Sequence, residues 1–180
     1  MLGLDPGYGR MGWAAVEQRG SSLVSLGYGA FETPASAPFG VRLLAVHEFV
    51  QGLARRHPGA EAAVETLFFS RNTSTAMAVA QARGVILLAL CQAGITPLEV
   101  SPQHVKMAVA ASGKAGKAQV QAMTQRLLGL KSLPKPDDAA DALALALAGL
   151  RSLPLRRLQA RLAPLAKPRK PTPAKARTLS

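Results

Sequence analysis

The sequence predicts an α/β layer fold, in which the strands of a sheet alternate with helices along the chain. The prediction comes from three strand-like segments at the amino terminus, followed by a helix, a strand, a helix, a strand and further helices. A second observation concerns acidic residues, since Asp5 and Glu65 each end an apolar strand-like run. Ligand sites in such sheets lie at the carboxyl ends of parallel strands. We therefore expect a functional site at that edge of the sheet.

The first three strands are predicted to form an antiparallel meander. They cover residues 1–6, 11–18 and 22–32. The segments between them, Gly7-Tyr8-Gly9 and Arg19-Gly20-Ser21, are short and contain glycine, which is typical of turns. Strands joined by such short turns pair as antiparallel neighbours.

The remaining elements follow from hydrophobic periodicity and from residues that start or stop helices. The apolar spacing between Val41 and Arg55 suits an amphipathic helix that ends near Pro58-Gly59. Ser101-Pro102 predicts a helix start, because serine caps a helix and proline fits its first position. The other expected elements are a buried strand at 62–65, a largely apolar helix at 73–93, a strand at 95–100, a short helix through Val109, a flexible loop at 113–116, and helices at 117–128 and 137–150.

Length and composition divide the chain into one domain and a tail. With 180 residues, 48% of them hydrophobic, the chain is long enough for one full core. Residues 152–180 contain five prolines, eight lysines or arginines and no acidic residue. This composition is typical of disorder. We expect a folded domain at 1–151 and a disordered basic tail at 152–180.

The charge of the chain indicates a polyanionic partner. A formal net charge of +12 attracts nucleic acid in particular, although the tail carries most of this charge. Cys91 is the single cysteine, so it forms no disulfide framework within the chain, and its apolar neighbours predict a small core residue. No cleavable signal and no uninterrupted apolar run of about 20 residues is evident. We expect a cytoplasmic protein without a membrane span.

Four carboxylates are candidates for a metal site. Asp5, Glu65 and Asp141 follow or interrupt apolar segments, where an unpaired charge costs several kcal/mol or more and must be neutralised, paired or bound to a cation. Asp138 lies one helical turn before Asp141, so both occupy one face of the helix. Oxygen ligands without histidine or cysteine favour Mg²⁺ or Mn²⁺. Two such ions can activate a water and stabilise the leaving oxygen of a phosphodiester, which indicates a nuclease.

Each carboxylate also has an ordinary structural interpretation. Asp5 begins an Asp-Pro-Gly sequence that is common in turns, and Glu65 could face solvent at the end of its strand. Asp137 and Asp138 suit the cap and first turn of a helix. Asp141 is harder to explain in this way, because aspartate has poor propensity in the second turn of an Ala/Leu helix. Taken together, the four positions favour a metal site over separate structural roles.

Basic and aromatic residues provide candidates for contacts with nucleic acid. Lys106, Lys114 and Lys117 flank a loop and could hold backbone phosphates, although scattered lysines usually face solvent. Phe68, or its neighbour Phe69, could stack on a base, although burial is the more common fate of phenylalanine. Arg71 is a further candidate for a phosphate contact.

At these positions the chain resembles the RuvC family of crossover (Holliday) junction endodeoxyribonucleases. The resemblance covers about residues 1–150 and depends on six motifs in the same order. These are Gly3-Leu4-Asp5-Pro6-Gly7, Val64-Glu65-Thr66-Leu67-Phe68, Gln81-Ala82-Arg83-Gly84, Gln103-His104-Val105-Lys106, Gly116-Lys117-Ala118-Gln119-Val120 and Asp138-Ala139-Ala140-Asp141-Ala142.

The resemblance implies an RNase H-like fold with a mixed five-stranded sheet flanked by helices. It implies a homodimer that nicks two strands of a four-way DNA junction symmetrically with Mg²⁺ or Mn²⁺, with two ions expected per site, and a branch-migration motor as a partner. We expect the apolar helix at 73–93 to form the dimer surface or, alternatively, to be buried in the monomer. By motif position, the metal ligands would be Asp5, Glu65, Asp138 and Asp141; Phe68 would contact bases; Lys106 and Lys117 would lie near the scissile phosphates, with Lys117 also catalytic.

Three other functions remain open from the sequence. The first is a different RNase H-like nuclease that acts on RNA or on RNA–DNA hybrids. The second is a structural DNA-binding module without turnover, which is disfavoured because all four acidic positions are present. The third is a sugar-kinase or actin-like ATPase, which needs two lobes and therefore more than 180 residues.

Overall fold

A five-stranded mixed sheet forms the centre of the molecule. The computed structural model describes residues 1–66 and 73–162. The strand order is β3-β2-β1-β4-β5; β1, β2 and β3 pair as an antiparallel meander, and β4 and β5 run parallel to β1. The predicted meander and the mixed five-stranded α/β architecture are therefore confirmed. The strands are β1 (Leu2–Asp5), β2 (Arg10–Arg19), β3 (Ser22–Glu32), β4 (Ala62–Glu65) and β5 (Leu98–Val100).

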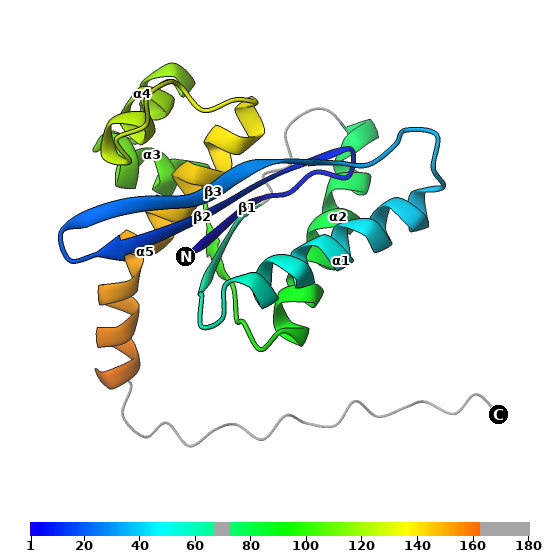
Figure 1. Cartoon of the computed structure of the whole chain (residues 1–180), viewed down its shortest axis with the longest axis horizontal. Helices are drawn as coiled ribbons and strands as arrows, with labels where there is room; N and C mark the ends of the chain where they lie inside the picture. Colours follow the sequence, from blue (N-terminus) through cyan, green and yellow to red (C-terminus); the bar gives the residue numbers. More distant parts are fainter. Residues whose placement is uncertain (67–72, 163–180) are drawn as a thin grey trace.

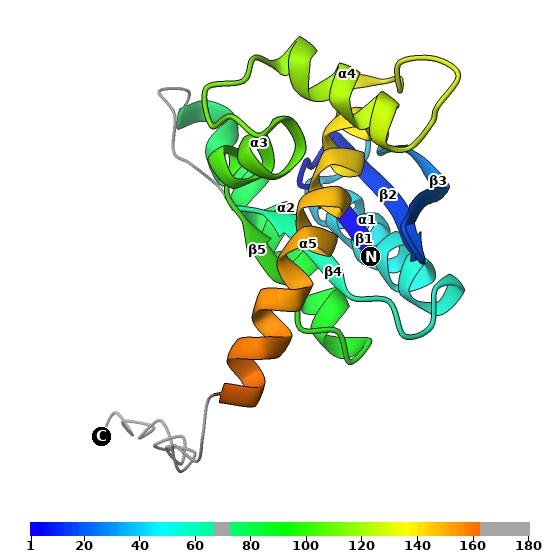
Figure 2. The same cartoon turned by 90° about the vertical axis from the view of Figure 1, so that its left-hand side faces the viewer.

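Helices cover both faces of the sheet. On one face, α1 (Phe39–Arg56) and α2 (Thr73–Gln92) pack against one another and share a core with β1, β2 and β4. On the other face, α5 (Asp137–Leu162) crosses β1 and β2, and α3 (Pro102–Ala110) and α4 (Lys117–Leu127) pack against it. Figures 1 and 2 show this layered arrangement, with α3 and α4 gathered at one end of α5.

The period of two along the strands assigns each side chain to a face. In β1, Leu2 and Leu4 enter the core under α1 and α2, so Gly3 and Asp5 face α5. In β4, Val64 likewise faces α1 and α2, and Glu65 is directed to the side of α5. Both strand-end carboxylates therefore point toward the helix that carries Asp138 and Asp141.

Two glycines allow α5 to lie unusually close to the sheet. A Cβ atom on Gly3 would be 2.0 Å from the carbonyl oxygen of Ala142, and one on Gly12 would be 2.0 Å from the carbonyl oxygen of Asp138. Both obstacles are helix backbone, which cannot turn aside as a side chain can. The absence of these side chains brings the first turns of α5 against β1 and β2, and so brings the aspartates of α5 beside Asp5.

The structure corrects two expectations. The last helix does not end near residue 150, because α5 continues through Pro154 to Leu162, so residues 152–162 of the expected disordered tail are helical. A proline removes one helical hydrogen bond and can kink a helix without ending it. Cys91 is exposed, and not in the core, because it lies on the outward side of α2 while Ile86, Ala89 and Leu90 fill the core. Residues 163–180 of the tail lie outside the described residues.

Candidate active site

The four predicted carboxylates converge at the carboxyl ends of β1 and β4. Asp5 ends β1, Glu65 ends the neighbouring parallel strand β4, and Asp138 and Asp141 come from the first turns of α5. The negative charges repel one another: Asp5 interacts electrostatically with Glu65, Asp141 and Asp138, and Glu65 interacts with Asp141. Residues that are 136 positions apart in the chain therefore form one acidic cluster.

The cluster is electrostatically unfavourable when all its members are ionised. Burial, reinforced by the negative charges of Glu65, Asp141 and Asp138, raises the pKa of Asp5 from 3.8 to about 8. Burial also raises the pKa of Glu65, with Asp141 adding to the effect. For Asp141, burial raises the pKa although a hydrogen bond from Lys117 opposes it. Such shifts are typical of functional sites, because a cation of opposite charge would relieve them.

Two basic side chains partly neutralise the cluster. The Nζ atom of Lys117, at the start of α4, donates to Asp141 at 3.0 Å and lies 3.2 Å from the carboxylate of Asp137. These interactions outweigh the effect of burial and raise the pKa of Lys117 above its ordinary value. The guanidinium of Arg10 lies 3.4 Å from Asp138 and also pairs with Glu32. Lys117 is thus the predicted lysine that the fold does bring to the carboxylates.

The donor set fits a hard divalent cation, although the ligands are not closed into a cage. Four carboxylates supply only oxygen atoms, which suit Mg²⁺ or Mn²⁺. The raised pKa values of Asp5, Glu65 and Asp141 indicate that positive charge would be stabilised there. In residues 1–66 and 73–162, however, no three acidic, histidine or cysteine side chains are close enough to form a ready metal cluster. The role of the four carboxylates as metal ligands therefore stays a prediction.

The other predicted contact residues have different outcomes. Lys106 is half-buried on α3, and Lys114 is exposed in the segment between α3 and α4. Neither one is hydrogen-bonded or ion-paired to the carboxylates in the described part of the chain. Phe68 and Arg71 lie outside the described residues. The proposed contacts of all four residues with nucleic acid stay predictions.

The sequence reasoning missed Arg10 and the partnership of Asp137 with Lys117. Arg10 begins β2, and the antiparallel register that pairs Asp5 with Gly12 brings Arg10 to the same edge of the sheet. Asp137 is held by Lys117 and by a 3.3 Å hydrogen bond from Gln121. The hydrogen bond from Lys117 lowers the pKa of Asp137. The register of the hairpin of β1 and β2 could have indicated that Arg10 lies near Asp5. The contact between Asp137 and Lys117 could not be predicted locally, because it depends on the packing of α4 on α5.

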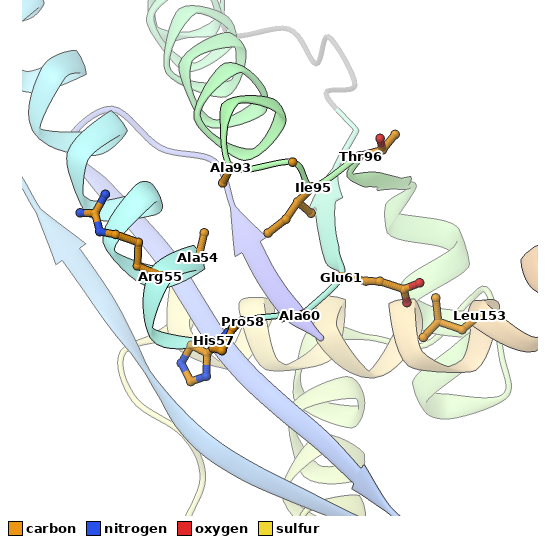
Figure 3. Close-up of a pocket in the computed structure, with 12 residues that line it drawn as sticks. Ala54, Arg55, His57, Pro58, Ala60, Glu61, Ala93, Ile95, Thr96 and Leu153 are labelled. Carbon is orange, nitrogen blue, oxygen red and sulfur yellow. The ribbon is translucent and has the colours of Figure 1, made fainter.

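A separate groove of about 800 Å³ lies at the opposite edge of the sheet. Figure 3 shows it between the end of α1 and the end of α2, with His57, Glu61 and Ile95 among its lining residues and Leu153 contributed by α5. The lining segments lead into β4 and β5, so this groove is at the amino ends of those strands. Asp5 and Glu65 are at the carboxyl ends, and the groove is therefore distinct from the acidic cluster.

Comparisons with known proteins agree with this arrangement. The family whose model matches residues 1–149 is described as "Crossover junction endodeoxyribonuclease RuvC". A protein of that name from Desulfitobacterium hafniense is 45% identical over 155 residues, which are 86% of this chain and 94% of the relative. One from Chloroflexus aggregans is 50% identical over 146 residues, which are 81% of this chain and 89% of the relative.

Solved structures show the same similarity in three dimensions. The structure of Thermus thermophilus RuvC in complex with Holliday junction substrate is similar with a TM-score of 0.78 and 31% identity, covering 86% of this chain and 94% of that one. The yeast mitochondrial Holliday junction resolvase Ydc2 is similar with a TM-score of 0.61 and 13% identity, covering 89% of this chain and 83% of that one, which supports the fold alone.

Proposed function

The chain belongs to the RuvC family of crossover junction endodeoxyribonucleases, and on that premise we propose that it resolves four-way DNA junctions by metal-dependent phosphodiester hydrolysis in recombination and DNA repair. The observation that carries the proposal is the convergence of Asp5, Glu65, Asp138 and Asp141 at one edge of the sheet. A relative with 31% identity has been solved with a Holliday junction substrate, which supports the substrate class.

The residues of the cluster have complementary roles in this proposal. Asp5, Glu65, Asp138 and Asp141 would hold divalent metal ions, on which RuvC-family nucleases depend; we propose Mg²⁺ or Mn²⁺, with two ions per site. Such ions supply the activation of a water molecule and the neutralisation of the leaving oxygen. Lys117, whose ammonium group already lies at the cluster, would remain charged and hold the scissile phosphate.

The decisive experiment compares the wild type with Asp141→Asn on a mobile four-way junction. We expect paired nicks from the wild type with Mg²⁺ or Mn²⁺, and a loss of cleavage of at least about 100-fold in the variant, because a direct ligand should matter more than the outer residues that alone cost 10–100-fold. Both proteins should bind the junction with similar affinity in a gel shift with EDTA. Glu17→Gln, a carboxylate-to-amide change on β2 outside the cluster, is the control and should cut normally.

Other outcomes would indicate the competing functions. Faster cleavage of an RNA–DNA hybrid or a linear duplex than of the junction would indicate a different RNase H-like nuclease. Binding without cleavage by the wild type, with either metal ion, would indicate a structural DNA-binding module. Full activity of Asp141→Asn would remove Asp141 from the site.

We also propose that the protein is a homodimer with α2 at its interface. The helix is apolar, yet Met77 and Leu88 are 69% and 53% exposed. The segment Thr75–Gln92 has a mean hydropathy of 1.4. Judged only by its length and composition, it could cross a membrane, although the polar residues Gln81 and Arg83 interrupt it. A second copy would cover this apolar face, and a two-fold axis would match two cuts in strands of like polarity.

Replacing Leu88 by aspartate should weaken the dimer. A charge in an apolar interface costs its desolvation, so we expect Leu88→Asp to shift the protein to monomers at micromolar concentration. Analytical ultracentrifugation measures this shift, and paired nicking of the junction should give way to single nicks. Leu26→Asp, on the edge strand β3, is the matched control for an exposed leucine and should remain dimeric. A wild-type monomer at all concentrations would contradict the dimer proposal.

The remaining sequence expectations belong to the same proposal. Phe68 would contact bases at the junction, and Arg71, Lys106 and Lys114 would contact phosphates. We also propose a cytoplasmic location, because the proposed substrate is DNA. A branch-migration motor is the expected protein partner, because it would deliver the mobile junction to be cut.

A further inference from the structure

Arg83, on α2, is fastened to the strand that carries Glu65. Its Nε atom donates a 2.9 Å hydrogen bond to the main-chain carbonyl oxygen of Glu65, and its Nη2 atom donates to the carboxylate of Glu99 on β5. One guanidinium therefore joins three elements: β4, β5 and α2. The planar fork of arginine is suited to hold two acceptors at once in a defined geometry.

The burial of Arg83 makes both contacts important. Its side chain is only 15% exposed, and a guanidinium that loses its hydration must be paired. Glu99 supplies the opposite charge while remaining half exposed itself. It faces α2 because it alternates with Val100, which enters the core under α5. The ion pair therefore supports α2 against the outer part of the sheet.

The contact lies at the point where the ladder between β4 and β5 ends. Glu65 is the last residue of β4, and beyond it the Thr66 amide donates to the carbonyl oxygen of Val100 at 2.9 Å. The Thr66 amide belongs to the same peptide group whose oxygen accepts from Arg83. That peptide group is thus held on both sides, by β5 and by α2. Its orientation sets the direction in which the Glu65 side chain leaves the strand toward Asp5 and Asp141.

We propose that Arg83 is a positioning residue for Glu65: it holds the Glu65 peptide group so that the carboxylate is presented to the metal ions, and Glu99 holds Arg83 in place. The inference rests on the proposed function for the role of Glu65. Residues that orient a metal ligand typically contribute 10–100-fold to metal affinity. Arg83 would act through Glu65, whose main-chain oxygen it contacts.

The test measures Mn²⁺ binding directly, in the full-length protein. We expect Arg83→Lys, which keeps the charge but loses the fork, to weaken Mn²⁺ binding about tenfold by calorimetry. Glu99→Gln should weaken it by a smaller factor, because an acceptor oxygen remains. Junction binding in EDTA should stay within about twofold of the wild type, and raised Mn²⁺ concentrations should restore cleavage by both variants.

Arg19→Lys and Glu17→Gln are the matched controls, because Arg19 and Glu17 form an exposed ion pair on β2. Both should bind Mn²⁺ as the wild type does. Unchanged Mn²⁺ affinity in folded Arg83→Lys would overturn the proposal, and if that variant does not fold, unchanged affinity in Glu99→Gln would do so. Cleavage that excess Mn²⁺ cannot restore would reduce Arg83 to a general structural role. If the wild type binds Mn²⁺ and does not cut junctions, the proposed function fails, while weakened binding by Arg83→Lys would still support the positioning role.

Discussion

Replacing Asp5 by asparagine is expected to stabilise the metal-free protein at alkaline pH and to abolish cleavage. The pKa of Asp5 is about 8 in the folded protein against an ordinary value of 3.8. Between these values the folded state keeps a proton that the unfolded state has lost, so stability falls as the pH rises through this window. The loss of stability caused by ionised Asp5 is fully present above about pH 8. Asparagine carries no charge at any pH, and we expect a gain of roughly 1–3 kcal/mol at pH 8.5 and almost none at pH 4.

Urea unfolding in EDTA at pH 4 and pH 8.5 measures this difference. Asp137→Asn is the control, because Lys117 lowers the pKa of Asp137, and its replacement should bring no gain at alkaline pH. Added Mn²⁺ should stabilise the wild type and leave Asp5→Asn unchanged, since a ligand stabilises only the state that binds it. Cleavage by Asp5→Asn should fall at least about 100-fold. Equal stability of the wild type and Asp5→Asn at pH 8.5 would show that the ionised carboxylate of Asp5 does not destabilise the folded protein.

The second large effect is expected from Gly12→Ala. A Cβ atom at this position would lie 2.0 Å from the carbonyl oxygen of Asp138 and 2.6 Å from its carbonyl carbon. The first turn of α5 must then move away from β2, which we expect to cost about 1–3 kcal/mol or more of stability, as overpacking does. The movement displaces Asp138 from the cluster, so cleavage should fall further than the loss of folded protein explains.

Thermal unfolding and cleavage by the folded fraction separate the two effects of this substitution. Gly40→Ala, near the start of α1, is the matched control because nothing lies within 4 Å of its added methyl group. Alanine is favoured over glycine in a helix, so this control should be as stable as the wild type or slightly more stable. A Gly12→Ala variant that is fully stable and active would contradict the close packing of α5 on β2.

Local sequence patterns were sufficient for most elements. The meander and the later parallel strands agree with alternation and apolar runs, although β5 begins at Leu98 and not at residue 95. The start of α3 agrees with its predicted cap, because the Ser101 side chain accepts a hydrogen bond from the His104 amide. These signals come from neighbours in the chain. The end of α5 was predicted too early, since Pro154 is only locally unfavourable and the helix continues. Cys91 was misplaced because its apolar neighbours did not show which side of α2 faces the sheet.

The sequence by itself indicated the four carboxylates that the fold brings together, because acidic residues within apolar segments must be compensated. The order and spacing of the six motifs shared with the family supported the same four positions. Tertiary structure alone decided the partners: Lys117 reaches Asp141 only because α4 packs on α5, and Arg83 reaches the Glu65 peptide only because α2 packs beside β4. These contacts join residues that are distant in the chain, and the close approach that permits them depends on the packing of whole elements, which no local pattern encodes.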